Sequence, residues 1–114
     1  MSDCLFCKII AGDIPSTKVF ETDSVLGFKD LSPVAPHHVL FVPKKHIATI
    51  NEATPENALH FGSLFVAAAT YAQQIGVVEP GYRVTMNCNE AAGQTVFHVH
   101  LHFLAGRSLS WPPG

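Results

Sequence analysis

The sequence predicts an α+β fold built on an antiparallel sheet. Short strand-like runs surround one long helix-like stretch, and the two kinds of element do not alternate regularly along the chain. That order is typical of α+β proteins rather than of parallel α/β folds. The chain has 114 residues, of which 47% are hydrophobic and 14% charged, so it is expected to form one globular domain over residues 1–114.

The N-terminal half is predicted to hold a short helix and three strands. The expected elements are a helix over 6–11 and strands over 18–21, 25–29 and 38–42. Gly12 ends the helix, since glycine adopts the left-handed conformation that closes a last helical turn. A turn at 22–24 joins the first two strands into a hairpin, and Pro43 closes the third.

The C-terminal half is predicted to hold the long helix and two more strands. Thr54 caps the helix, Pro55 takes its first position, Glu56 lies in its first turn, and Gly76 ends it. A fourth strand is expected over 82–87, and a fifth, which contains three histidines, over 97–104.

The histidine run is the strongest functional signal. His98, His100 and His102 alternate with apolar residues, which is the period of a half-buried strand. The three imidazoles should then share one face of the strand, with neighbours roughly 6.5 to 7 Å apart. Two chemistries fit this spacing. One is a three-histidine metal site with an open position, and the other is nucleophilic attack by an imidazole on phosphorus.

Two further features concern ligands. The loop before the histidine strand offers a glycine, amides and a hydroxyl, a composition suited to cradling a phosphate: Asn87, Gly93, Gln94 and Thr95. Cys4 and Cys7 have the spacing that places two thiolates on one metal, and histidines would have to complete that site. A redox dithiol and two unrelated buried thiols are the alternatives.

Charge and composition exclude several partner classes. The formal net charge is -2 and the basic residues are scattered, so no nucleic-acid partner is expected. No apolar run reaches the roughly 20 residues of a membrane-spanning helix, so no membrane association is expected. The start lacks the pattern of a signal peptide, and the three cysteines are an odd number, so a cytoplasmic protein is expected.

The histidine run also resembles a known family. Residues 98–104 match the histidine-triad motif, in which three histidines alternate with apolar residues and two apolar residues end the run. The chain is identified as a member of the histidine triad (HIT) family, and its Trp-Pro-Pro-Gly ending is similar to the Hint branch. The resemblance extends over 6–10, 14–15, 28–33, 35–38, 42–46, 81–83, 93–94 and 106–114.

The resemblance implies a fold and an activity. The fold is a five-stranded antiparallel sheet with one long and one short helix, which pairs with a second copy into a continuous sheet. The activity is hydrolysis of a P–N or mixed anhydride bond at the α-phosphate of a purine nucleotide. His100 would attack the phosphorus and form a nucleotidyl-histidine, His102 would contact a phosphate oxygen, and His38 and His98 would move protons. No cofactor is required for this chemistry.

The resemblance also assigns binding residues. Asp30 would bind the ribose hydroxyls, while Phe6, Phe28 and Leu31 would line an apolar slot for the base. Thr95 departs from the serine that is usual in the Hint branch. A structural zinc would be held by Cys4, Cys7, His46 and His98. The tail over 105–114 would reach the active site of the dimer partner, where Trp111 would influence substrate choice.

Three other functions are compatible with the same residues. Dinucleoside polyphosphate hydrolysis belongs to a sister branch of the family. A metal-dependent enzyme that uses the three histidines as ligands is a second alternative. A nucleotide-binding regulator without catalysis is a third, although such a protein would need no nucleophile.

Overall fold

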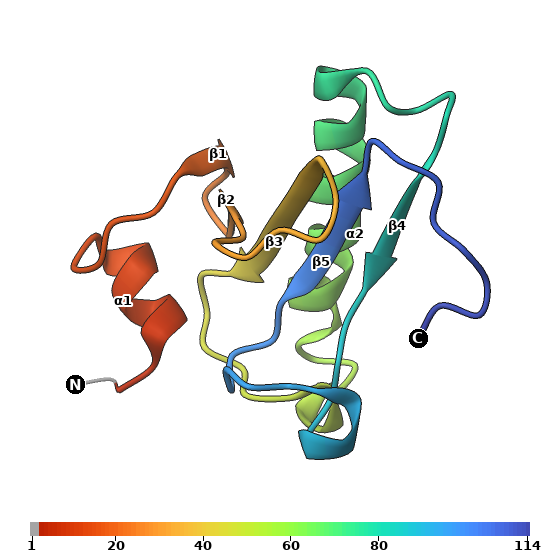
Figure 1. The fold of residues 1–114 in the computed structure, drawn as a ribbon. Coiled ribbons are helices and arrows are strands. Elements are labelled where there is room, and N and C mark those ends of the chain that lie inside the picture. Colours follow the sequence, from red (N-terminus) through yellow and green to blue (C-terminus); the bar gives the residue numbers. More distant parts are fainter. Residues whose placement is uncertain (1–2) are drawn as a thin grey trace.

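The computed structural model describes residues 3–114, which form one antiparallel sheet and two α-helices (Figure 1). The strand order is β1-β2-β3-β5-β4. The elements are, in chain order, α1 (Leu5–Ala11), β1 (Lys18–Glu21), β2 (Val25–Lys29), β3 (His37–Pro43), the 3-10 turn η1 (Ile50–Glu52), α2 (Ala58–Ile75), β4 (Tyr82–Thr85), the 3-10 turn η2 (Glu90–Ala92) and β5 (Leu101–Ala105). The predicted α+β class and the five-stranded antiparallel sheet are confirmed.

The two helices serve opposite faces of the sheet. On one face, α2 packs Leu64 and Tyr71 against Phe41 and Phe103, the centre of the larger buried cluster. On the other face, Leu26, Phe28, Leu40 and Val42 join Phe6 and Ile9 of α1 in a second cluster. Because Leu40 lies opposite His102 in the β3–β5 register, His102 projects on the α1 side. The face away from α2 therefore carries the histidines.

The long helix begins later than predicted. It starts at Ala58 rather than at Pro55, and its N-cap Asn57 makes no side-chain capping bond. The Asn57 Oδ1 instead accepts the Thr54 N–H at 2.7 Å, and the Thr54 Oγ1 accepts the Asn57 N–H at 3.3 Å. These reciprocal bonds close a turn before the helix. The predicted end at Gly76 is confirmed, with φ 76°.

The histidine strand is shorter than predicted. β5 begins at Leu101, so His98 and His100 precede it and only His102 lies within it. The segment before β5 pairs with the loop after β3 instead, because the Val99 N–H donates to the Ile47 carbonyl at 2.7 Å. His98 is also fully buried, and the prediction of one strand that carries all three histidines is wrong, because only His102 lies in β5.

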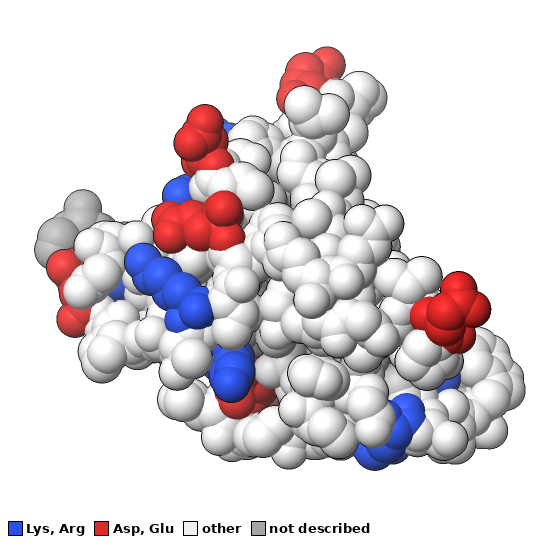
Figure 2. Space-filling view, turned by 90° about the horizontal axis from the view of Figure 1, so that it is seen from above, with Lys and Arg blue, Asp and Glu red and all other residues white. Residues whose placement is uncertain are grey.

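The surface carries no broad basic region on the face drawn in Figure 2, where Lys and Arg lie in separate patches interspersed with Asp and Glu. Within residues 3–114, no helix is long and apolar enough to cross a membrane.

Candidate active site

His100 is held in a single orientation by the backbone of its own motif. Its Nδ1 lies 2.8 Å from the His98 carbonyl oxygen, which can only accept, so Nδ1 carries the proton. The Nε2 of the neutral ring is then the unprotonated nitrogen. The ring is 7% exposed and meets the edge of Phe6 at a centroid distance of 5.0 Å. A buried imidazole with a fixed tautomer and an available lone pair is suited to nucleophilic attack.

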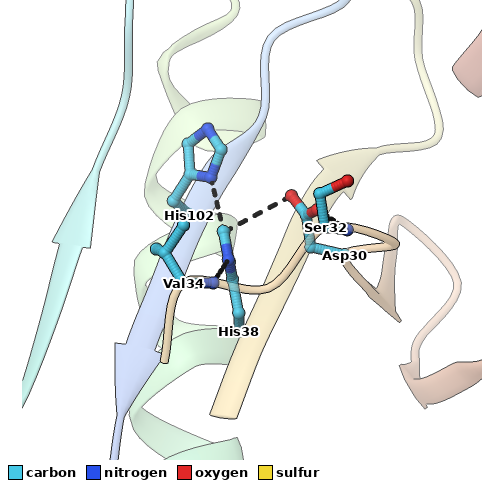
Figure 3. Close-up of polar contacts among 5 residues, drawn as sticks. All are labelled: Asp30, Ser32, Val34, His38 and His102. Atoms are coloured by element: carbon cyan, nitrogen blue, oxygen red, sulfur yellow. Dashed lines mark hydrogen bonds and ion pairs between the residues drawn. The ribbon is translucent and has the colours of Figure 1, made fainter. Parts of the chain in front are cut away.

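The ring of His102 lies 5.2 Å from that of His100, centroid to centroid, and forms a pair with His38. Figure 3 shows this pair. The Val34 N–H donates to the His38 Nδ1 at 3.1 Å, so the proton of the neutral His38 ring must be on Nε2. That Nε2 is 3.0 Å from the His102 Nδ1 and 3.4 Å from the Asp30 Oδ2. The His102 Nδ1 therefore accepts, and its own proton lies on Nε2.

Burial keeps these imidazoles neutral. Desolvation lowers the pKa of His102 to about 4, with smaller contributions from His100 and His38. Desolvation also lowers the pKa of His38, opposed by the carboxylate of Asp30, and lowers the pKa of His98. Near pH 7 the rings of His38, His98 and His102 are therefore neutral, and hydrogen bonds set their tautomers.

Four residues from distant parts of the chain form a candidate metal centre. The Sγ atoms of Cys4 and Cys7 lie 3.4 and 3.5 Å from the His98 Nδ1. The His46 Nδ1 lies 3.4 Å from the Cys7 Sγ and 3.3 Å from the His98 Nδ1. Zinc–sulfur and zinc–nitrogen bonds of about 2.3 and 2.0–2.1 Å imply tetrahedral N···S and N···N separations of about 3.6 and 3.3 Å. The four side chains therefore fit a zinc ion.

The hydrogen bonding of His98 agrees with a ligand role. Its Nε2 lies 2.8 Å from the Pro43 carbonyl oxygen, so Nε2 carries the proton and Nδ1 presents its lone pair to the cluster. Zinc-bound histidines generally donate their second N–H to such a carbonyl.

A second cluster fails the same test. Asp30, His38 and His102 also bring their ligand atoms within 4.8 Å of one another. The Val34 N–H occupies the His38 Nδ1, however, so the nitrogen that faces the cluster is protonated and cannot bind a metal. Among the described residues the three triad imidazoles do not converge on one point, which disfavours the three-histidine metal enzyme.

An apolar pocket of about 210 Å³ opens between α1 and β2. Phe6, Phe28, Asp30 and Leu31 all line it, so the structure brings together the four residues assigned to the base and the ribose. Leu31 is 95% exposed and lies at its rim, whereas Phe6 and Phe28 are buried.

Comparisons with known proteins identify the family. The HIT domain model matches residues 11–109. The chain belongs to the HIT family. It is 47% identical over 112 residues to an uncharacterized HIT-like protein of Synechococcus elongatus, covering 98% of this chain and 97% of that one. It is 43% identical over 107 residues to the purine nucleoside phosphoramidase of Escherichia coli K12, covering 94% and 90%.

Solved structures agree with this membership. A HIT family hydrolase from Legionella pneumophila matches with a TM-score of 0.96 and 48% identity, over 98% of this chain and all of that one. A histidine triad protein from Clostridium difficile matches with a TM-score of 0.93 and 44% identity, over 96% of each chain.

The loop before the triad uses its polar residues unequally in this HIT domain. Gln94 is buried, its Oε1 accepts the Asn89 N–H at 2.8 Å, and its Nε2 donates to the carbonyls of Ala48 and Val96 at 2.8 and 3.1 Å. Its side chain therefore holds the loop together, and its backbone N–H also donates within the loop, to the Asn89 carbonyl at 3.1 Å. Gly93 adopts a φ of 89°, a conformation that favours glycine.

The remaining predicted residues do not line the apolar pocket. Asn87 is half-buried, and Thr95 is exposed beside Cys4 and His46 in a different hollow. Trp111 is 82% exposed, and no tail residue lines the apolar pocket.

Two backbone groups that contribute to the site were not predicted from the sequence. These are the Val34 amide and the Pro43 carbonyl, which fix the tautomers of His38 and His98. Both are backbone groups, and every residue other than proline carries the same pair, so no residue type signals them.

Proposed function

We propose that this HIT-family hydrolase cleaves the P–N or mixed anhydride bond at the α-phosphate of purine nucleoside phosphoramidates. The observation that carries the proposal is the bond between the His100 Nδ1 and the His98 carbonyl, because it leaves the opposite nitrogen as a nucleophile. The phosphoramidase name of the 43% identical relative supports this choice of substrate.

The reaction begins with attack of the His100 Nε2 lone pair on the α-phosphorus. The P–N bond breaks and a nucleotidyl-histidine remains, while the leaving nitrogen departs as the amine with a proton from solvent that the hydrolysis step later returns. Water then attacks the same phosphorus and releases the nucleotide and the neutral imidazole. The His102 Nε2–H, directed away from His38, donates to a phosphate oxygen as negative charge develops there.

The apolar pocket would hold the purine against Phe6 and Phe28, with Leu31 closing its rim. Asp30 would accept the ribose hydroxyls. Its Oδ1 already accepts the Ser32 N–H at 2.7 Å, which orients the carboxylate without using all its lone pairs. Asn87 and the Thr95 hydroxyl would contact the phosphate, whereas the N–H groups of Gly93 and Gln94 already donate to the carbonyls of Glu90 and Asn89 at 2.9 and 3.1 Å.

A zinc ion would have a structural role. When bound, it would join the start of α1 to His46 and His98, and so fix Phe6 beside His100. α1 has only seven residues, too few to be stable alone, so such a tether would matter. Because zinc would occupy the His98 Nδ1 while Nε2 is bonded to Pro43, His98 would take no part in proton transfer.

A homodimer is proposed on the exposed apolar face of α2. Leu59, Phe65 and Val66 are 80%, 52% and 68% exposed there. Large apolar side chains grouped on one surface are typical of an interface. Residues 1–114 would act as a single HIT domain whose tail over 105–114 reaches the partner. A cytoplasmic location and the lack of a nucleic-acid partner stay predictions from the sequence.

The decisive experiment measures hydrolysis of adenosine 5′-phosphoramidate by the wild type, His100→Ala and the control His60→Gln, with and without a zinc chelator. His60 lies on α2, outside the site. We expect turnover by the wild type and the control to survive chelation while the fold persists, and His100→Ala to lose it by at least about a hundredfold. Activity retained by His100→Ala, or lost on chelation from a folded protein, would contradict nucleophilic catalysis.

A further inference from the structure

We propose that Arg107 is a positioning residue that sets the tautomers of His38 and His102 through the backbone of Val34. The positioning role rests on the hydrogen bonds that join Arg107, Val34 and His38. Its consequence for turnover rests on the proposed function.

Arg107 and His38 bind the same residue from two sides. The Arg107 Nε–H donates to the Val34 carbonyl at 3.0 Å, and the Val34 N–H donates to the His38 Nδ1 at 3.1 Å. The Val34 side chain is 58% exposed, so it does not anchor the loop in the core. Hydrogen bonds from the Val34 backbone to the side chains of Arg107 and His38 therefore hold Val34 opposite His38.

A glycine lets the start of the tail approach this loop closely. A Cβ on Gly106 would lie 2.8 Å from the Pro36 Cβ and 3.3 Å from the His37 Cδ2. Its φ of 99° is also unfavourable for other residues. The β3–β5 ladder pairs His37 with Ala105, so the chain leaves β5 directly beside the loop. Arg107 is thus delivered to Val34 by the fold and not only by a long side chain.

The tautomer of His102 depends on this arrangement, whose contacts are drawn in Figure 3. With the Val34 N–H on its Nδ1, His38 must keep its proton on Nε2 and donate it to the His102 Nδ1. If the Val34 N–H moves away, only the Asp30 Oδ2, 3.4 Å from the His38 Nε2, still favours a proton on that nitrogen, and His38 can take the opposite tautomer. Its Nε2 lone pair would then face the His102 Nδ1, and His102 would have to move its proton to that nitrogen. The N–H that His102 presents to a phosphate oxygen would be lost.

The other arginine of the chain, Arg83 in β4, does not share this role. The Arg83 Nη2 donates to the Ser110 carbonyl at 3.0 Å, which joins β4 to the tail without a bond to the Val34 loop. Arg83 therefore offers a matched control, since it also loses a guanidinium-to-carbonyl bond when it is replaced.

Two substitutions separate the Nε–H donor from the rest of the Arg107 side chain. In Arg107→Met the terminal methyl takes the place of Nε, so the side chain still reaches that position but has no donor there. In Arg107→Gln the amide nitrogen takes that place, so a donor is kept and the charge is lost. Both remove the second bond of Arg107, from Nη1 to the Ser108 carbonyl at 2.9 Å. Any difference between them therefore reports on the bond to Val34.

The test uses the full chain and two readouts that need no turnover. Imidazole ¹⁵N chemical shifts report the tautomers of His38 and His102, and amide hydrogen exchange reports protection of the Val34 N–H. For the wild type, Arg107→Gln and Arg83→Met we expect one tautomer at each histidine and a protected Val34 amide. For Arg107→Met we expect mixed tautomers, faster exchange at Val34, and kcat for adenosine 5′-phosphoramidate about three- to tenfold lower with KM little changed.

The outcomes distinguish this proposal from the proposed function. Wild-type tautomers and Val34 protection in Arg107→Met would overturn the positioning role, whatever the activity. Equal effects of Arg107→Met and Arg83→Met would show a general loosening of the tail, and would overturn it as well. Altered tautomers in a protein that does not hydrolyse phosphoramidates would leave the positioning role intact and reject the substrate.

Discussion

The loop that precedes the triad should depend on one buried amide. Gln94→Ala removes the acceptor for the Asn89 N–H and the donor for the carbonyls of Ala48 and Val96. Ala48 lies between β3 and η1, whereas Asn89 and Val96 flank η2 before β5, so the amide joins two segments that are far apart along the chain. The loop over 89–96 should therefore separate from the segment that contains Ala48 when the amide is removed.

The magnitude follows from the three contacts. At about 0.5–1.5 kcal/mol each, their loss should lower the free energy of unfolding by about 2–4 kcal/mol. For a domain of 114 residues this corresponds to a melting temperature lower by roughly 8–16 °C, at about 4 °C per kcal/mol.

Thermal unfolding followed by circular dichroism, without nucleotide, measures the effect. Gln74→Ala is the matched control, since Gln74 is exposed on α2 and should change stability by less than about 0.5 kcal/mol. If Gln94→Ala unfolds like the control but binds nucleotide more weakly, the side chain serves as a ligand and our assignment of it as a scaffold is wrong.

Three further predictions concern the metal, the pH dependence and the tail. The wild type should bind one zinc ion per chain, and Cys7→Ser should bind less zinc and melt at a lower temperature, as measured by elemental analysis and calorimetry. A wild type that is purified without zinc and melts at the same temperature as Cys7→Ser would contradict this. Because burial lowers the pKa of His102 from 6.5 to about 4, the unfolded chain binds more protons between these values. The free energy of unfolding should be constant above about pH 6.5 and fall by about 2 kcal/mol towards pH 4. This fall is smaller than the free energy that corresponds to the whole pKa shift, because the ring is partly exposed. His102→Gln should flatten this slope, and an unchanged slope would count against the assignment. Removal of residues 108–114 should change the preference among phosphoramidate substrates more than the melting temperature, and equal kcat/KM ratios in both proteins would refute it.

The architecture could be read from local patterns to a large extent. The alternation of Val99, Leu101 and Phe103 predicted their burial, and each of them is buried. Gly12 and Gly76 end their helices with positive φ, as their positions predicted. Element starts were less predictable, because the start of β5 depends on a partner segment and the start of α2 on a turn closed by two side chains.

The membership of the candidate site was also largely readable, whereas the roles within it were not. The sequence singled out Cys4 and Cys7 by their spacing, and the structure places them against His46 and His98. Gln94 was expected to face a phosphate, yet its side chain is turned into the protein. Residue type alone does not show which way a polar side chain points.

The sequence by itself determined the α+β class, the order of the strands along the chain and the identity of the chemical groups, because periodicity, turn residues and side-chain chemistry are local properties. Only the tertiary structure decided which nitrogen of each imidazole carries the proton. That choice depends on the carbonyls of His98 and Pro43 and on the amide of Val34. Pro43 is separated from its histidine by 55 positions, so chain folding brings the two together. Hydrogen bonds from the backbone leave no trace in residue identity, and here they decide which nitrogen of each histidine carries a proton and which presents a lone pair.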